Sequence, residues 1–574
     1  MYLLWGLIPA DYTVGIEHRG NFAFKAALTK SNSTMVNLDE LIPKLGGFGY
    51  YQKRLYILLT VPIAVAGMFM IMMVFALYTP NHSCKRPHDS SSFNDSRSGR
   101  FTASECTLRQ EGDEQLNSSN ASLSNISRHI TPLPCSEWDY DDDVFKKTFT
   151  TTHNLVCQES LKISHAQMIF YFGVVIGDIL FGQLSDLIGR KKTLIIAMFI
   201  LLVSGLSGSF SPEYYSFVVI QFVVGTACKG CLVLAFVMGF EFVGPDMRVW
   251  LGQALNIIFA LALCSLCGLG ILIKDWQYIQ ITCTIPTVLF ILLWFVLDES
   301  PRWLLSKGRT EEAKSVLLKI ARTNKVTPDG NLLQQLEHEK STHTEKISSL
   351  FKNRTLAIRT LVVFFNWFGL GMTYYGVFLH AENLGGNFYL AIFLLSVIEI
   401  PILLVNLYLL NKFGRRRVHC LTMMTGGLAC ICSIFPVIFG GEELQPLILA
   451  LAVIGKMGAS GAFGSIYVIS GEVFPTIVRN GAVGASSSFA RIGSMLAPYI
   501  AKLGTVGVGS YGKAIPLIVF GACSITAGLF ALLLPETMGC RLPDTIEEAV
   551  DFKLLREDPN TESETEELRS MIEN

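Results

Sequence analysis

Charged side chains interrupt the longest apolar segments of this chain. Lys229, Glu399 and Arg491 each lie well inside such a segment. Charge inside a membrane helix is costly, so each of these residues is a functional candidate by default. An arginine can hold a carboxylate through two parallel hydrogen bonds, and a glutamate can contact a cation. The three side chains therefore favour binding of a small charged molecule. The alternative is that Glu399 forms a structural ion pair with Arg491 or with Lys229.

Aromatic residues accompany these charges along the chain. Phe236 follows Lys229 by seven residues, so the two side chains share one face of a helix. Four more aromatic residues occupy two later apolar segments, namely Tyr374, Tyr375, Phe463 and Tyr467. The face of an aromatic ring attracts a quaternary ammonium by about 0.5–2 kcal/mol. We expect these side chains to line one cavity with the three charges, although core packing explains any one of them equally well.

A second set of charges occurs twice in the chain. Asp186-Leu-Ile-Gly189-Arg190-Lys191-Lys192 recurs in the second half of the chain as Asn411-Lys-Phe-Gly414-Arg415-Arg416-Arg417. At nearly the same offset, Glu241 with Arg248 recurs as Glu472 with Arg479, and Glu299-Ser-Pro301 has a looser counterpart in Pro535-Glu536-Thr537. Three markers in one order at a nearly constant offset indicate two homologous halves. A site between two halves of membrane helices is how a transporter alternates its access.

The repeated charges predict a conformational latch. Glycine permits a tight turn between two helices, and a carboxylate near a helix end can cap a neighbouring helix or pair with an arginine. We expect the cluster to hold the two halves together and to release when they rock. A plain basic loop would explain Arg190 to Lys192, but not Asp186, the glycines or the second copy. The predicted latch residues are Asp186, Gly189, Arg190, Glu241, Arg248, Arg302, Gly414, Arg415, Glu472 and Arg479.

Helices must position these residues, and the composition predicts a membrane protein. Of 574 residues, 51% are hydrophobic and 16% are charged, whereas about 25% are charged in a typical soluble domain. A membrane-spanning helix takes about 20 mostly apolar residues. Twelve segments qualify: 55–78, 165–184, 193–210, 213–243, 247–273, 276–297, 356–380, 387–410, 418–439, 444–471, 480–503 and 512–534. The 49 glycines suit close helix packing in lipid, and a net charge of −1 gives no reason to expect nucleic acid.

Charge sets the expected orientation in the membrane. The short loops after the second and eighth helices are basic, and the loop 298–355 carries eleven Lys and Arg residues. By the positive-inside rule these loops face the cytosol, which places both termini there. We expect an all-α membrane protein of twelve transmembrane helices in two pseudo-symmetric halves. Its parts are a cytosolic segment 1–54, a first six-helix half 55–297, a cytosolic loop 298–355, a second six-helix half 356–534 and a cytosolic acidic tail 535–574.

The polar loop 79–164 is expected outside the cell. It contains five N-x-S acceptor sequences for glycosylation, at Asn81, Asn94, Asn117, Asn120 and Asn125. One acceptor is common by chance, but five so close together favour a glycosylated outer loop. The loop also contains Cys84, Cys106, Cys135 and Cys157, which suggests two disulfides with three possible pairings. The other ten cysteines lie in or beside apolar segments, as small packing residues do.

The loop from Gly182 to Lys192 resembles the signature of the major facilitator superfamily. Further segments narrow the resemblance to its organic cation, carnitine and organic anion transporter family: Leu45 to Arg54, Asp298 to Arg309, Gly471 to Arg479 and Leu534 to Thr537, with the outer loop after the first helix. The resemblance covers about residues 38–550. It implies the major facilitator fold and an uncoupled or ion-coupled carrier of small organic ions. Nothing in the sequence resembles the phosphate-binding loop of an ATP-driven pump.

The resemblance also implies roles for the buried charges. At the position of Arg491, cation carriers of the family tend to have aspartate, whereas carnitine-type and anion carriers tend to have arginine. The anion branch often adds a lysine where this chain has Leu403, and cation carriers often have tyrosine and tryptophan where it has Phe236 and Leu232. Arg491 together with Glu399 in one cavity fits a zwitterion such as carnitine.

The leading interpretation is a plasma-membrane secondary transporter of small organic ions, either carnitine-type zwitterions or organic cations, working by alternating access. An organic anion exchanger is one alternative, and a transport-inactive receptor or binding protein on the same fold is another. We see no metal-ligand cluster and no Ser/His/Asp set that stands out, so neither an enzyme nor a cofactor is expected. A coupling ion, sodium or a proton, stays open. Asp178 lies either near the cytosolic interface or at the site of that ion.

Overall fold

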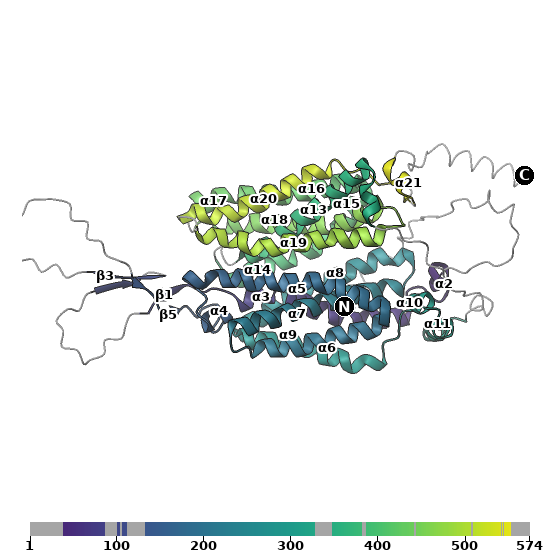
Figure 1. The fold of residues 1–574 in the computed structure, drawn as a ribbon, viewed down its shortest axis with the longest axis horizontal. Coiled ribbons are helices and arrows are strands. Elements are labelled where there is room, and N and C mark those ends of the chain that lie inside the picture. Colours follow the sequence, from purple (N-terminus) through teal and green to yellow (C-terminus); the bar gives the residue numbers. More distant parts are fainter. Residues whose placement is uncertain are drawn as a thin grey trace, which may run out of the picture.

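The computed structural model consists of helices that run side by side, with short strands at one end (Figure 1). It describes residues 38–85, 100–103, 106–111, 133–327, 347–381, 386–440, 443–506, 509–540, 542–543 and 545–552. Long apolar segments fold as helices in a membrane because a helix satisfies its backbone N–H and C=O groups internally.

Each predicted membrane segment coincides with one helix or with two consecutive helices. The first half consists of α3 (Tyr50–Ala76), α5 (Leu161–Ile188), α6 (Arg190–Ser209), α7 (Tyr214–Glu241), α8 (Pro245–Ile273) and α9 (Trp276–Leu292), followed by η2 (Leu293–Phe295). The second half consists of α13 (Arg354–Leu379), α14 (Phe388–Val397) with α15 (Glu399–Phe413), α16 (Arg415–Cys432) with α17 (Ile434–Phe439), α18 (Gln445–Val473), α19 (Arg479–Val506) and α20 (Gly509–Ala531). Within the described residues, ten of these spans are long and apolar enough to cross a membrane. The other two are α9, which is shorter, and α19, which is less apolar.

The two halves repeat the same packing. In the first half α6 packs against α7 and α9, and in the second half α16 packs against the equivalent helices α18 and α20. The halves meet where α5 packs against α19 and where α8 packs against α14 and α15. Figure 1 shows the halves as two layers, the first in purple, blue and teal and the second in green and yellow. The internal repeat of the sequence is therefore a repeat of structure.

Glycines allow the closest helix contacts in each half. In α5, a Cβ at Gly177 would collide with the backbone carbonyl of Thr226 on α7. In α13, a Cβ at Gly371 would collide with the carbonyl of Ala490 on α19. Small residues at such crossings let two backbones approach, which is how helices associate in lipid.

Short elements cover the two ends of the helix bundle, and the ends are named after them. At the α11 end lie α2 (Leu38–Lys44), α10 (Pro301–Ser306), α11 (Thr310–Asn324), η3 (Ile347–Phe351) and α21 (Ile546–Val550). At the strand end lie α4 (Phe149–Thr152), η1 (Cys157–Ser160) and five strands. There β1 (His82–Cys84) pairs with β5 (Trp138–Tyr140), and β3 (Thr107–Glu111) pairs with both β2 (Arg100–Ala103) and β4 (Leu133–Pro134).

Two disulfides connect the segments of the strand end. Cys84 bonds to Cys135 and Cys106 bonds to Cys157, which selects one of the three pairings that the sequence left open. Asn81, the first expected glycosylation site, is exposed just before β1. The other four expected sites, Asn94, Asn117, Asn120 and Asn125, lie outside the described residues.

Polar contacts join the two halves at the strand end. The Ser164 hydroxyl donates to the Pro498 carbonyl at 3.2 Å. The Tyr389 hydroxyl donates to the carbonyls of Val144 and Gly270 at 2.7 and 3.1 Å. Between described residues, no hydrogen bond or ion pair joins the halves at the α11 end. Among the described residues, polar contacts between the halves are therefore found at the strand end only.

Candidate substrate-binding site

Arg491 is a buried cation that forms no ion pair with a carboxylate among the described residues, although the charge of Asp178 acts on it from a greater distance. It lies near the middle of α19, and 4% of its surface is exposed. Its Nη1 donates to the Tyr375 hydroxyl at 3.1 Å, and its Nε has no hydrogen-bond partner. A guanidinium keeps its charge when buried and presents its N–H groups as a planar fork. This side chain is therefore suited to a carboxylate that arrives with a ligand.

Lys229 forms an ion pair within the first half. Its ammonium lies 3.4 Å from a carboxylate oxygen of Asp178, which stands on the adjacent helix α5. Both side chains are mostly buried. From the sequence, Asp178 was expected either near the cytosolic membrane interface or at the site of a coupling ion. In the structure it is the partner of Lys229.

Glu399 is paired within the second half. Its Oε1 lies 2.6 Å from the ammonium of Lys456 on α18, and the Tyr374 hydroxyl donates to the same oxygen at 2.6 Å. The pairs considered from the sequence, Glu399 with Arg491 or with Lys229, do not form. Each acid pairs instead with a lysine of its own half, because packing brings α5 against α7 and α15 against α18.

Lys456 was not among the residues predicted for the cavity. The signal that singled out Lys229, a lysine inside an apolar segment, applies to it equally. The number of residues between Lys229 and Lys456 lies between the two offsets at which the latch charges repeat along the chain. They therefore occupy equivalent places on the fourth helix of each half. Each half contains one buried lysine paired with an acid from its second helix.

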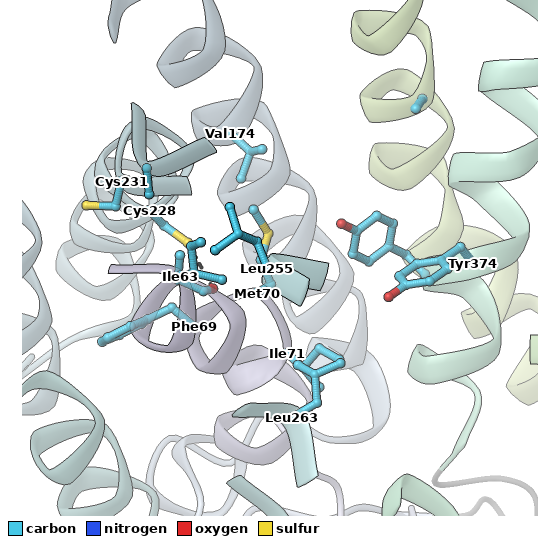
Figure 2. Close-up of a cluster of buried hydrophobic side chains, with 14 of the residues drawn as sticks. Ile63, Phe69, Met70, Ile71, Val174, Cys228, Cys231, Leu255, Leu263 and Tyr374 are labelled. Atoms are coloured by element: carbon cyan, nitrogen blue, oxygen red, sulfur yellow. Dashed lines mark hydrogen bonds between the residues drawn. The ribbon is translucent and has the colours of Figure 1, made fainter. Parts of the chain in front are cut away.

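Two adjacent tyrosines connect these charges. The rings of Tyr374 and Tyr375 are 5.0 Å apart, and their hydroxyls reach Glu399 and Arg491 respectively. The Tyr375 ring also lies edge-on to Tyr171 of the first half, at 5.1 Å. Figure 2 shows Tyr374 projecting from the second half toward the side chains of the first. The guanidinium and the acid are therefore linked through two adjacent tyrosines, one of which contacts the first half.

The other predicted aromatic residues are placed differently. The Phe463 ring lies 4.9 Å from that of Tyr374 and so belongs to the same group. Tyr467, on the same helix, keeps 46% of its surface exposed. The ring contact of Phe236 is with Phe240 at 6.1 Å, and no contact joins it to the charged residues in the described part of the chain. Phe236 is thus the predicted lining residue that the structure leaves apart.

The charged residues of this region do not balance. The two acids, Asp178 and Glu399, carry −2, and the three bases, Lys229, Lys456 and Arg491, carry +3, which leaves a net charge of +1. Charge is poorly screened away from bulk water, so such a region attracts an anionic group.

The first predicted latch forms within the first half. Arg190 contacts Asp186 at 2.6 Å and Glu241 at 3.2 Å. Glu299 accepts hydrogen bonds from the backbone N–H groups of Arg190 and of the next residue, at 2.8 and 3.1 Å. Gly189 has a φ of +108°, and a Cβ there would collide with the Glu299 carboxylate. The turn therefore requires glycine.

The second latch repeats this arrangement in the second half. Arg415 contacts Glu472 at 3.3 Å, and its backbone N–H donates to Glu536 at 2.8 Å. Gly414 has a φ of +90°, and a Cβ there would collide with Glu536. The sequence predicts that these charges hold the two halves together, whereas in this structure each set contacts only partners in its own half.

Asp39 on α2, which the sequence did not predict as a site residue, is the partner of two predicted latch residues. Arg248 and Arg302 both donate to its Oδ1. Burial alone would raise the pKa of Asp39, but the hydrogen bonds and charges of Arg302 and Arg248 outweigh it and hold this pKa below its ordinary value of 3.8. Arg479, the repeat counterpart of Arg248, donates to backbone carbonyls instead.

Known proteins resemble this chain over most of its length. A family model described as "Sugar (and other) transporter" matches residues 137–548. The chain is 35% identical to an organic cation transporter protein of Drosophila melanogaster, over 93% of this chain and 98% of that protein. It is 32% identical to solute carrier family 22 member 13 of Homo sapiens, over 90% and 93%. It is 29% identical to a beta-alanine transporter of Drosophila melanogaster, over 89% of each chain.

Solved structures resemble the fold. The inward-open conformation of the xylose transporter XylE from E. coli superimposes with a TM-score of 0.59 and 15% identity, covering 88% of this chain and all of that one (100%). At this identity the similarity concerns the fold alone.

Proposed function

This chain belongs to the solute carrier family 22 branch of the major facilitator superfamily, and from that premise we propose that it carries small organic ions with a carboxylate group across the plasma membrane. Proteins of this family are transporters, so the chain is a multi-pass membrane transporter of organic ions and not an enzyme. Two parts of this statement are proposals: that the substrate bears a carboxylate, and that the membrane is the plasma membrane.

The unpaired guanidinium of Arg491 is the observation that carries the proposal. Its Nε has no hydrogen-bond partner, and its Nη1 bonds to the neutral hydroxyl of Tyr375. Buried donors that stay unsatisfied cost free energy. A substrate carboxylate beside Arg491 would supply both the missing charge and two acceptors, in the geometry that a guanidinium prefers.

Carnitine-type zwitterions are the first candidates. The ammonium group of such a molecule suits aromatic ring faces. The Tyr375 hydroxyl contacts the guanidinium, and its ring packs against that of Tyr374, which in turn packs against Phe463. The relative named for beta-alanine also points to this class, because beta-alanine is a small zwitterion with a carboxylate.

Organic anions are the second candidates. Glu399 is neutralised by Lys456, and the region has a net charge of +1, which favours an anion over a simple cation such as tetraethylammonium. The relatives named for organic cations support transport of organic ions as a class. The names of these relatives do not support the preference for an anion.

Alternating access would proceed by rocking of the two halves. If the strand end is extracellular, as its expected glycosylation implies, the polar contacts there close the outer side, and the substrate site opens toward the cytosol at the α11 end. In the opposite state the two latches would come together. Asp178, buried beside Lys229, is the first candidate to bind a coupling ion, either sodium or a proton.

Uptake by cells that express the chain tests the proposal. Labelled carnitine, beta-alanine, p-aminohippurate and tetraethylammonium are offered in parallel, with untransfected cells as the control. We expect saturable uptake of at least one carboxylate-bearing compound and none of tetraethylammonium. Uptake of tetraethylammonium alone would contradict the assigned charge class. If purified protein binds carnitine and no compound is taken up, the receptor interpretation gains support.

A further inference from the structure

A cavity lies between the two halves at the strand end of the bundle. Its lining comes from α5 and from α3 with the residues just after it in the first half, and from α13 and α19 in the second half. The empty space has a volume of about 470 Å³, including its opening to solvent. We call it the strand-end cavity and define it by Ser164 and Gln167 on α5 and by Pro498 and Lys502 on α19.

The side-chain amide of Gln167 faces this cavity. The residue is 9% exposed, and no hydrogen bond of its side chain is found within the described part of the chain. A primary amide offers two N–H donors and an acceptor. Buried polar groups without partners cost free energy, so a molecule that bonds to this amide would be stabilised in the cavity.

The charge of the lining favours a carboxylate. Lys502 contributes a cation, and none of the described residues that line the cavity is acidic. Ammonium and amide N–H groups both donate to a carboxylate, and hydrogen bonds to a charged group are the stronger kind. Leu77, Ile163 and Leu379 supply apolar walls. The lining therefore suits a small monocarboxylate with a short apolar chain, such as butyrate.

Both halves are needed to form the strand-end cavity. The Ser164 hydroxyl donates to the Pro498 carbonyl at 3.2 Å, and this contact between the halves lies in the cavity wall. Gln167 and Lys502 likewise come from opposite halves. If the halves separate at this end, these groups move apart and the site is lost. A ligand that binds one of two states shifts the protein toward that state.

We propose that the strand-end cavity binds a small organic monocarboxylate, which holds the two halves together at this end and so slows transport. The site is separate from the candidate substrate site. Lys502 follows Arg491 by eleven residues on α19, which is roughly 16 Å along the helix. The inference rests on the proposed function for the rocking of the halves, whereas binding itself does not depend on it.

Binding of butyrate to purified protein tests the proposal. The titration is made with the Arg491→Ala protein, so that the probe cannot bind through the guanidinium of the substrate site. If that variant does not fold, Arg491→Gln takes its place. Thermal unfolding is measured across a titration of sodium butyrate, with sodium chloride at the same ionic strength as the reference. We expect butyrate to raise the unfolding temperature, because it binds the folded protein. No rise would overturn the proposal.

Lys502→Gln, added to this protein, removes the cation of the cavity. It should weaken butyrate binding at least roughly tenfold, which is about 1.4 kcal/mol. Lys162→Gln is the matched control, because Lys162 lies at the same end of α5, pairs with Glu159 and is not part of the lining. Its butyrate affinity should stay within about twofold of the starting protein. Equal losses in the two variants would mean that any lysine at this end attracts the probe, and would overturn the proposal.

Ala501→Leu is the second variant of the cavity. Ala501 lines the cavity, so the larger side chain fills part of the space and leaves Lys502 in place. Butyrate binding should again weaken at least roughly tenfold. This variant decides the test if Lys502→Gln does not fold. Unchanged affinity in a folded Lys502→Gln or Ala501→Leu protein would overturn the proposal.

Uptake tests the effect on transport. With butyrate outside cells that express the wild-type chain, maximal uptake of labelled carnitine should fall at least about twofold, and Lys502→Gln should remove this effect. A rise in the half-saturating carnitine concentration alone would place the inhibition at the substrate site and overturn the proposed effect.

Binding and uptake separate the two ideas. Failure of wild-type cells to take up any carboxylate compound would refute the proposed function, but it would leave butyrate binding at the strand-end cavity intact. Absence of butyrate binding would refute the strand-end site alone, and carnitine transport through Arg491 would then stand without it.

Discussion

At the residue scale, Arg491→Ala should abolish most of the affinity for a carboxylate-bearing substrate. Loss of a charge-assisted bidentate contact that leaves the partner buried costs about 2–5 kcal/mol. That corresponds to roughly 30-fold or more in affinity, since about 1.4 kcal/mol is tenfold. The measurement is concentration-dependent uptake, normalised to the amount of protein at the cell surface.

Two related variants control this prediction. Arg491→Lys should restore affinity only in part, because lysine keeps the charge but loses the planar fork. Tyr375→Phe removes the hydroxyl that Arg491 contacts and should change affinity much less than Arg491→Ala does. Unchanged affinity in a surface-expressed Arg491→Ala protein would rule out the carboxylate contact.

Asp39 predicts a pH dependence of stability. Its pKa in the folded protein lies below 3.8, so its contribution to stability is complete above that value and is lost as pH falls through the lower folded pKa. Asp39→Asn should therefore lower the unfolding temperature at pH 7. The difference from wild type should shrink as pH falls below about 4.

Thermal unfolding of purified protein at several pH values checks this. Asp142→Asn, which changes an exposed loop carboxylate, is the matched control and should have little effect at any pH. A destabilisation by Asp39→Asn that stays constant down to pH 3 would show that charge is not the cause.

The buried charges show what the sequence can and cannot predict about the site. A charge inside an apolar segment is visible in the sequence, which is why Lys229, Glu399 and Arg491 were identified as candidates. Which charge meets which depends on the helices that pack together. Fewer residues separate Asp178 from Glu399 than separate Lys229 from Lys456. The constant offset of the sequence repeat therefore does not by itself identify the two ion pairs as equivalent.

At the element scale, every predicted span is helical, but two helix breaks were not predicted. The eighth span divides after Val397 and the ninth after Cys432. Proline lacks an N–H and cannot bond to the residue four before it, and Pro401 and Pro436 stand four residues after these two ends. A proline alone does not predict a helix break, because α3 continues through Pro62.

Gly177→Ala should destabilise the first half. A Cβ there meets the Thr226 carbonyl on α7, so α5 and α7 must move apart. Overpacking of this kind costs about 1–3 kcal/mol. Gly182→Ala is the control on the same helix, because nothing lies within 4 Å of a Cβ at Gly182. Thermal unfolding should separate the two variants, and equal stability would argue against the close crossing.

Asp186→Asn should slow transport more than it weakens binding. In this structure 71% of the Asp186 side chain is exposed, so its ion pair with Arg190 adds little stability here. We expect its carboxylate to matter in the state where the latches meet. Maximal uptake should therefore fall several-fold while the apparent affinity stays within about twofold. A pure loss of affinity at unchanged maximal rate would contradict the latch.

At the scale of the whole molecule, the proposed orientation in the membrane rests on the basic loops and on the glycosylation expected from the sequence. Asn81 is exposed at the strand end, in line with an outer position for the loop 79–164. Treatment with an N-glycosidase should shift the protein from eukaryotic cells toward the 63.4 kDa of the bare chain. Asn81→Gln should remove part of that shift. Unchanged mobility after treatment of the wild type would contradict the orientation.

The overall architecture could be predicted because its signals are long and repeated. Twelve apolar segments and two copies of the latch charges specify two six-helix halves, and the structure has both. The state of the molecule could not be predicted in this way. Closure at the strand end depends on single contacts such as Ser164 with Pro498 and Tyr389 with Val144, and these have no counterpart in a periodic pattern.

The matched ion pairs Asp178–Lys229 and Glu399–Lys456 have a consequence for how such a protein can evolve. Because each half neutralises its own buried charge, a change at Arg491 alters the charge of the pathway without leaving another group unpaired. On the proposed function, in which Arg491 binds the substrate, one codon would then set the sign of the preferred cargo while the duplicated scaffold stays intact. A lineage that carries this arrangement can try new nutrients or toxins at little cost in folding, and selection can act on one position at a time.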